Sequence, residues 1–230
     1  MVGMSGADLM TGRLLVATPK LEDPNFARAV VLLLDHDDDG ALGVIISRPT
    51  TVPVAEVLPS WSELVTLPDV IFSGGPVATD SALAVAVLDG PDDDDAPVGW
   101  RPLYPGAGLV DLDAPPELLS GVLTGMRVFA GYAGWGSGQL ESEVAEGAWY
   151  VVPAQTDDLL CHDAELLWQR VLRRQPGELA FVATCPVDPS RTDHEPRREH
   201  RTRSVWRVST DVANSPSGPC RGFVEFPGEH

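Results

Sequence analysis

Short runs of apolar residues, separated by clusters of aspartate, glycine and proline, make up most of this chain. Two such runs, Phe26–Leu34 and Ala41–Ser47, flank the polar segment Asp35–Gly40. Apolar runs joined by a short Asp/Gly segment predict a β-hairpin, and the lack of polar alternation predicts that both faces of the hairpin are buried. We expect His36 to lie in the solvated turn of this hairpin, because loops are mostly polar surface.

Further strands and helices are predicted between the turn signals. The predicted strands are Arg13–Ala17, Val70–Ser73, Ser81–Leu88, a pair within Leu103–Leu112, Arg127–Ala130, Trp149–Val152 and Glu178–Thr184. The predicted helices are Val54–Leu58, Pro115–Ser120, Gln139–Glu146 and Ala164–Arg174, the last with Asp163 as its N-cap, and Gly90–Pro97 is predicted to be a surface loop. Because strands and helices are interleaved and some strands pair in sequence, we expect a mixed α/β or α+β sheet fold rather than a doubly wound one.

Residues 131–138 hold four glycines around the aromatic side chains of Tyr132 and Trp135. Glycine at this density is typical of positive φ or of close approach by a chain or ligand. The pattern predicts a tight turn with both aromatic side chains packed on backbone, and the alternative is a cleft for a neutral or cationic ligand. A phosphate site is disfavoured, because the spacing differs from G-x-G-x-x-G and glutamates follow in the first turns of the next helix.

The distribution of prolines and apolar residues along the chain predicts one domain with two extensions. We expect a flexible N-terminus at residues 1–11, a single domain at 12–185, and a disordered or loosely docked tail at 186–230, where prolines are frequent and apolar periodicity is weak. The start of the chain lacks the basic and apolar regions of a signal peptide, and no apolar run is long enough to span a bilayer. We therefore expect a cytoplasmic protein.

The net charge of −18 lies on residues 1–185, because the seven arginines and seven acidic residues of 186–230 cancel. An acidic body repels phosphate backbones, so nucleic-acid binding by residues 1–185 is disfavoured. The three cysteines are widely spaced and form no C-x-x-C pair, which predicts neither a zinc site nor a disulfide framework. No motif for a metal or a cofactor is present.

Candidate chemistry centres on Gly74, Gly75 and Pro76, which follow an apolar run and could expose backbone amides as a small anion nest. Ser73 precedes them, but no motif places a histidine to activate its hydroxyl. Glu141 and Glu143 are two residues apart and should point to different faces of their helix, which argues against a carboxylate pair.

Several motifs in order give the chain a specific resemblance. Residues 12–19, 23–26, His36, 40–49, 74–77 and 131–141, followed by Trp149, resemble the AlgH/YqgE family of bacterial proteins. The resemblance implies an α+β domain with a mixed, bifurcated sheet, a small barrel-like part and surrounding helices, and it implies no established activity. This chain has Ser47 where the family often has asparagine, and it lacks a histidine that the family often has after Gly-Gly-Pro-Val.

Three functions follow as hypotheses. The first is a non-enzymatic, regulatory protein that binds an unknown protein or small-molecule partner. We expect the glycine segments at 74–77 and 132–141 to come together and frame the binding cleft. The candidate binding residues are Gly74, Gly75, Pro76, Tyr132, Trp135, Gln139, Glu141, Arg48 and His36. The second is a hydrolase or transferase that uses His36 and Glu141 with Arg48 as an anion clamp. The third is a transcriptional regulator that contacts DNA, against which the acidic body argues.

Overall fold

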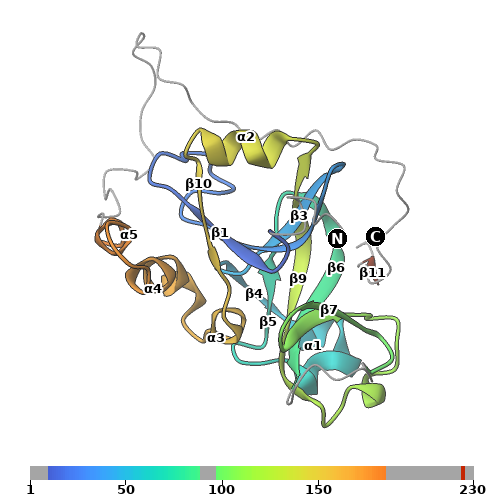
Figure 1. Cartoon of the computed structure of the whole chain (residues 1–230). Helices are drawn as coiled ribbons and strands as arrows, with labels where there is room; N and C mark the ends of the chain where they lie inside the picture. The colour runs from blue at the N-terminus through green and yellow to red at the C-terminus, as the bar shows by residue number, and fades with distance from the viewer. Residues whose placement is uncertain (1–9, 89–96, 185–223, 226–230) are drawn as a thin grey trace, which may run out of the picture.

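The computed structural model describes residues 10–88, 97–184 and 224–225 (Figure 1). Most of these residues belong to a curled sheet, and helices cover part of it. The strand order along the sheet is β10 (Trp149–Pro153), β1 (Arg13–Ala17), β2 (Val30–Asp37), β3 (Gly40–Ile45), β9 (Leu123–Gly136), β6 (Val77–Leu88), β8 (Ala107–Val110) and β7 (Trp100–Tyr104). Beside this path lie β5 (Val70–Ser73), β4 (Pro49–Pro53) and β11 (Val224–Glu225).

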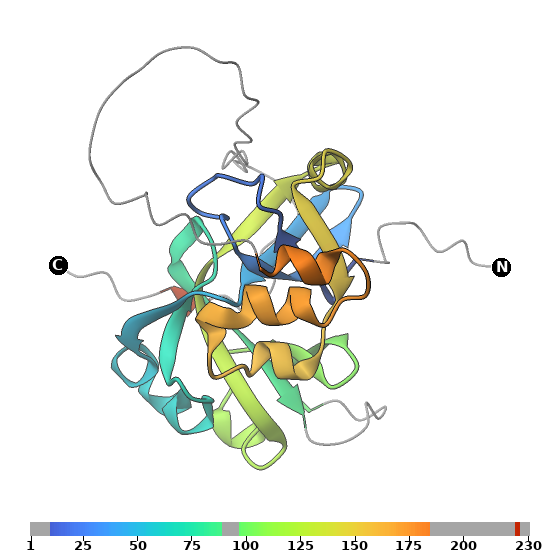
Figure 2. The same cartoon turned by 90° about the vertical axis from the view of Figure 1, so that its left-hand side faces the viewer.

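The helices are short and lie mainly at one end and on one side of the sheet. They are α1 (Val54–Val57), α2 (Gln139–Ala145), α3 (Thr156–Leu159), α4 (Leu167–Arg173) and α5 (Leu179–Val182), with 3-10 turns at Pro59–Leu64, Pro116–Leu118 and Ala164–Leu166. Figure 2 shows α3, α4 and α5 together in front of the sheet, whereas α2 crosses the end nearest β3 and β10 (Figure 1). Within the described residues, no helix is long and apolar enough to cross a membrane.

The long strand β9 organises the sheet, because two different strands pair with successive stretches of one of its edges. Residues 133–136 of β9 pair with β3, while Phe129 and Ala130 pair in parallel with β5. On its other edge β9 pairs with β6. One strand therefore joins the strands around β2 to those around β6.

Side chains of β1 and β2 alternate between two buried layers, as a pleated strand requires. Leu14 and Val16 pack in the layer that includes α4, whereas Leu15 and Ala17 pack in the layer beneath α2. β2 divides its side chains in the same way. The prediction that both faces of the β2–β3 hairpin are buried is confirmed.

Most predicted elements are present, but several predictions of local structure were wrong. Residues 178–184 form the helix α5 rather than a strand, since a short apolar run does not by its pattern distinguish the two. The glycine-rich residues 131–136 continue β9 rather than forming a tight turn. Asp163 precedes a 3-10 turn and its side chain makes no capping hydrogen bond. Residues 90–96 of the predicted surface loop and the tail lie outside the described residues, apart from β11.

The close contact at the β3–β5–β9 junction generates the first prediction. A Cβ at Gly74 would lie 2.2 Å from the carbonyl oxygen of Gly131, so Gly74→Ala should cost about 3 kcal/mol or more, or prevent folding. Gly138 has φ +68 but nothing within 4 Å of such a Cβ, so Gly138→Ala should cost about 1 kcal/mol. Urea unfolding followed by circular dichroism compares the two variants. Equal stability of the variants would contradict this packing.

Candidate functional site

The two glycine segments that the sequence singles out do lie together, but no hollow separates them. A Cβ at Gly75 would lie 2.1 Å from the carbonyl carbon of Tyr132, so the two backbones are in direct contact. The Gly74 amide donates to the carbonyl of Ala130 at 2.8 Å and is not free to act as an anion nest. The expected cleft between these segments is therefore a packed junction, and Pro76 and Tyr132 at its margin are partly exposed.

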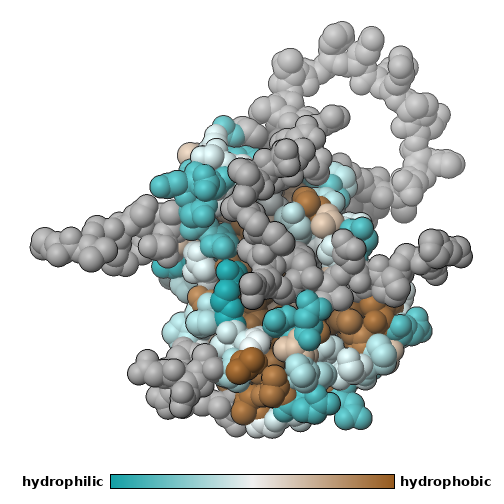
Figure 3. All heavy atoms as spheres, turned by 90° about the vertical axis from the view of Figure 1, so that its right-hand side faces the viewer, coloured by the Kyte–Doolittle hydropathy of each residue, from teal (hydrophilic) through white to brown (hydrophobic). Residues whose placement is uncertain are grey.

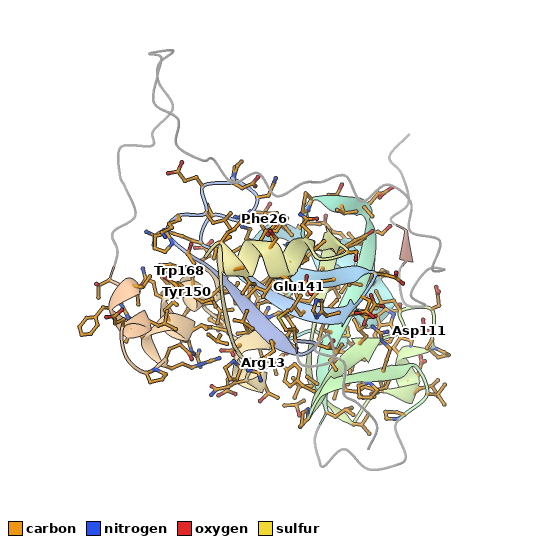
Figure 4. All side chains as sticks on the ribbon, turned by 45° about the horizontal axis from the view of Figure 1, so that its top comes forward. Arg13, Phe26, Asp111, Glu141, Tyr150 and Trp168 are labelled. Atoms are coloured by element: carbon orange, nitrogen blue, oxygen red, sulfur yellow. The ribbon has the colours of Figure 1, made fainter. Side chains whose placement is uncertain are left out.

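Trp135 is buried in an aromatic cluster rather than lying at the rim of a cleft. Its side chain is 2% exposed, and its ring lies 6.2 Å from that of Phe26 and 6.0 Å from that of Trp149 between centroids. Phe26 and Trp149 themselves meet edge to face at 5.7 Å. Figure 4 shows Phe26 on the loop beside α2. The indole packs in the core because the alternation along β9 turns residue 135 inward, toward this cluster.

A hydrogen-bonded network ties α2 to this cluster. The carboxylate of Glu143 accepts from the indole N–H groups of Trp135 and Trp149, at 3.0 and 2.8 Å. Gln139 donates to the same carboxylate and accepts from the amide of Gly136, both at 3.0 Å. Gln139 and Glu143 thus satisfy buried donors and fix the helix on the sheet, which is a structural task.

His36 is buried in β2, so its predicted place in a solvated turn was wrong. The strand continues to Asp37, which pairs with Gly40 across a two-residue turn, and only 3% of His36 is exposed. Its Nε2 lies 2.8 Å from Oε1 of Glu141, whose side chain is half exposed on α2 (Figure 4). The pair links the tip of the hairpin to α2. Glu141 and Glu143 reach different partners, as their spacing predicted.

Arg48 lies far from the histidine–glutamate pair. Its guanidinium donates to the carbonyls of Pro24 and Ala27, both at 3.2 Å, just before β2 begins. His36 lies near the other end of β2, about 20 Å away at 3.3 Å per residue. Burial lowers the pKa of the Arg48 guanidinium, and the carboxylate of Asp23 partly offsets this effect.

These positions disagree with the anion clamp of the hydrolase or transferase hypothesis, because Arg48 does not share a pocket with His36 and Glu141. Ser73 has no hydrogen bond to a histidine within the described residues. Those residues also contain no group of three or more histidine, cysteine, aspartate or glutamate side chains placed to hold a metal.

Sequence reasoning missed Arg127, a buried cation in the middle of β9. It is fully buried, and it donates to the carbonyls of Leu159 at 2.6 Å and Cys161 at 2.7 Å, with two longer bonds near the start of β5. The ring of Phe72 lies 4.4 Å from its Cζ. Burial lowers the pKa of Arg127 to about 10, with a smaller opposing effect of Cys161. A single arginine within an apolar run was the feature of the sequence that could have indicated this buried cation.

Sequence reasoning also missed the ion pair between Asp158 and Arg174. Asp158 is 1% exposed, and Arg174 binds both of its oxygens, with a distance of 2.7 Å from Nη2 to Oδ2. The bidentate arrangement is the strong form of this contact. Nearby, burial first and the Asp158 carboxylate second raise the pKa of Tyr104 to about 12, and Arg174 opposes them.

The curled sheet, with helices at one end and on one side, defines an AlgH-like fold. Residues 14–180 match the family model described as AlgH-like, DUF179, and the chain belongs to this family. The resemblance drawn from the sequence motifs is confirmed.

Relatives and solved structures agree with this assignment. A UPF0301 protein of Streptomyces avermitilis is 59% identical over 191 residues, which cover 83% of this chain and 99% of the relative. The crystal structure of protein DIP2367 from Corynebacterium diphtheriae has a TM-score of 0.73 and 34% identity, covering 80% of this chain and 95% of that one. The solution structure of AlgH from Pseudomonas aeruginosa has a TM-score of 0.56 and 26% identity, covering 81% and 99%.

The carboxylate of Glu143 generates the second prediction. Glu143→Ala leaves two buried indole donors without an acceptor and should lower the free energy of unfolding by about 2–4 kcal/mol. Glu146 lies one turn away, exposed, and bonds only to Ser142 within the described residues, so Glu146→Ala should change stability by less than about 0.5 kcal/mol. Urea unfolding measures both. A Glu143→Ala variant as stable as Glu146→Ala would show that the network does not hold α2.

Proposed function

We propose that this protein is a non-enzymatic binding protein that recognises an extended segment of a protein partner at the edge of β6. The observation that supports it most directly is the pairing of β11 with β6. Val224 lies opposite Ala82 and Glu225 opposite Ser81, in antiparallel register. β8 pairs only with Ala84–Val87, so it does not cover the earlier part of this edge of β6. There β6 pairs instead with β11, a strand from a distant part of the chain.

A wide bulge makes this edge unlike the rest of the sheet. Val77 lies opposite Tyr132 and Ala82 opposite Ala130, so five steps along β6 correspond to two along β9. Ala78, Thr79 and Asp80 therefore leave β9, and they are exposed. Backbone groups on such an edge can pair with another chain, which is the basis of recognition by strand addition.

Apart from β11, the other edge strands within the described residues carry proline, which cannot donate to a new strand. β4 begins with Pro49 and ends with Pro53, β7 contains Pro102, and β10 ends with Pro153. β6 contains no proline. The distribution leaves β6 as the edge best suited to accept a strand.

The bulge of β6 packs against the junction of the two glycine segments, which contains Gly75 and Gly131. Several candidate residues predicted from the sequence therefore lie beside the proposed binding edge. A Cβ at Gly131 would lie 2.8 Å from the carbonyl oxygen of Val77 and 3.2 Å from the Cα of Thr79. The carbonyl oxygen of Gly75 lies 2.7 Å from the same Cβ position, and Pro76 and Tyr132 are partly exposed. Figure 3 shows the side of the molecule on which β6 lies in Figure 1, with apolar patches mainly in the lower part of the view. We also propose that the sheet is bifurcated here, because β3 and β5 pair with successive stretches of β9.

The two remaining hypotheses have less support. The enzymatic hypothesis needs Arg48 as an anion clamp, but Arg48 binds the loop before β2 instead. The DNA-binding hypothesis is disfavoured because residues 1–185 carry 27 acidic and 9 basic side chains, which repel a phosphate backbone.

The third prediction tests strand addition in the full-length chain. Val224→Pro removes a backbone donor from β11 and should free the edge of β6. A labelled peptide of residues 221–228 should then bind the variant, and it should bind the unchanged chain more weakly, because the chain's own segment competes at high effective concentration. Fluorescence anisotropy measures both affinities. The matched control is the same peptide with proline at the position of Val224, which should not bind.

A photo-crosslinker at Thr79 extends the test to partners in cells. It should form an adduct that the 221–228 peptide suppresses, whereas the same group at the exposed Glu117 should form none that the peptide affects. The proposal fails if the peptide and its proline control bind alike, if neither binds, or if no Thr79 adduct responds to the peptide.

A further inference from the structure

A surface cavity of about 510 Å³, widely open to solvent, lies against α4. The helix α4 is on the side of the molecule opposite β11 (Figures 1 and 2). Its walls come from α4 and from the segment between α3 and α4. The lining residues are Cys161, Asp163, Leu166, Gln169, Arg170, Arg173 and Arg174. A volume of this size suits a small organic ligand.

Three arginines dominate the charge of this cavity. Arg170, Arg173 and Arg174 are spaced three and four residues apart, which places them on one face of the helix. Arg174 is bound to Asp158, but Arg170 contacts only the Sγ of Cys161, at 3.3 Å, and Arg173 has no partner within the described residues. Among the residues that the structure describes, these two guanidinium groups thus lack a carboxylate partner, although the chain has a net charge of −18.

Helix capping does not account for these two arginines. Basic residues are favoured in the last turn of a helix, where they can bond the terminal carbonyls. Neither Arg170 nor Arg173 donates to a helix carbonyl among the described residues. Instead their side chains line the cavity together with the amide of Gln169.

We infer that this cavity binds a small ligand through an oxyanion group, a carboxylate or a phosphate. The guanidinium fork matches the geometry of both groups, and Gln169 adds a neutral donor. Asp163 also lines the cavity and opposes an anion, but it is one carboxylate against two guanidinium groups that have no carboxylate partner in the described part of the chain. Leu166, which is 57% exposed, provides an apolar wall for the remainder of the ligand. The site is separate from the β6 edge.

The fourth prediction is tested by calorimetric titration of the full chain with inorganic phosphate and, separately, with succinate. Chloride holds the ionic strength constant, so general screening is the same in every titration. The chain should bind at least one of the two anions. The double variant Arg170→Gln and Arg173→Gln should bind it about tenfold more weakly for each lost guanidinium contact.

Arg101→Gln is the matched control, because Arg101 is an exposed arginine on β7 whose loss should leave anion affinity unchanged. Circular dichroism confirms that each variant is folded. Preference for phosphate or for succinate identifies which oxyanion the site takes. Binding of neither anion, equal binding by the double variant, or an equal loss in Arg101→Gln would overturn the inference.

Discussion

The backbone of Gly74 connects the two parts of the sheet. Its amide donates to the carbonyl of Ala130 in β9, and its carbonyl accepts from the amide of Ile45 in β3, both at 2.8 Å. Gly74 thus fills the place where β3 stops pairing with β9 and β5 begins. Only a residue without a Cβ fits there, because the carbonyl of Gly131 occupies the position that a side chain would need.

The two surfaces of interest depend on this junction in different ways. On one side of β9, contact between the glycine segments forces β6 to bulge and leaves its edge open to a strand. On the other side, β9 continues past the junction to present Trp135 to the cluster beneath α2. The cavity beside α4 is more remote, and it is held by Asp158 and Arg174 rather than by the glycines.

The sequence predicted the strands well, because apolar runs bounded by glycine and proline are a strong signal for buried strands. It predicted the hairpin but not its length, since the polar run Asp35–Asp37 is paired despite its composition. It also predicted that the glycine segments at 74–75 and 131–132 belong together. What it did not show was whether close backbone approach serves a ligand or another strand, because glycine is required in both cases.

The candidate site was less predictable than the fold. The network around Glu143 joins a strand, a helix and a second strand, so its members have no local spacing in the sequence. Arg127 is satisfied by carbonyls, which every residue carries, and no side-chain pattern indicates them. The arginines of α4 lie in its last turn, where positive charge is ordinary, and only the cavity beside them suggests another role.

Hydrogen exchange at the amides of Gly74 and Ile45 tests the junction most directly. If these amides are bonded within a packed fork of the sheet, they should exchange only through global unfolding, as slowly as amides in the centre of β2. Exchange at the rate of the exposed turn at Ser137 and Gly138 would instead show that the two glycine segments separate readily. The account of β9 as the strand that unites this fold would then be wrong.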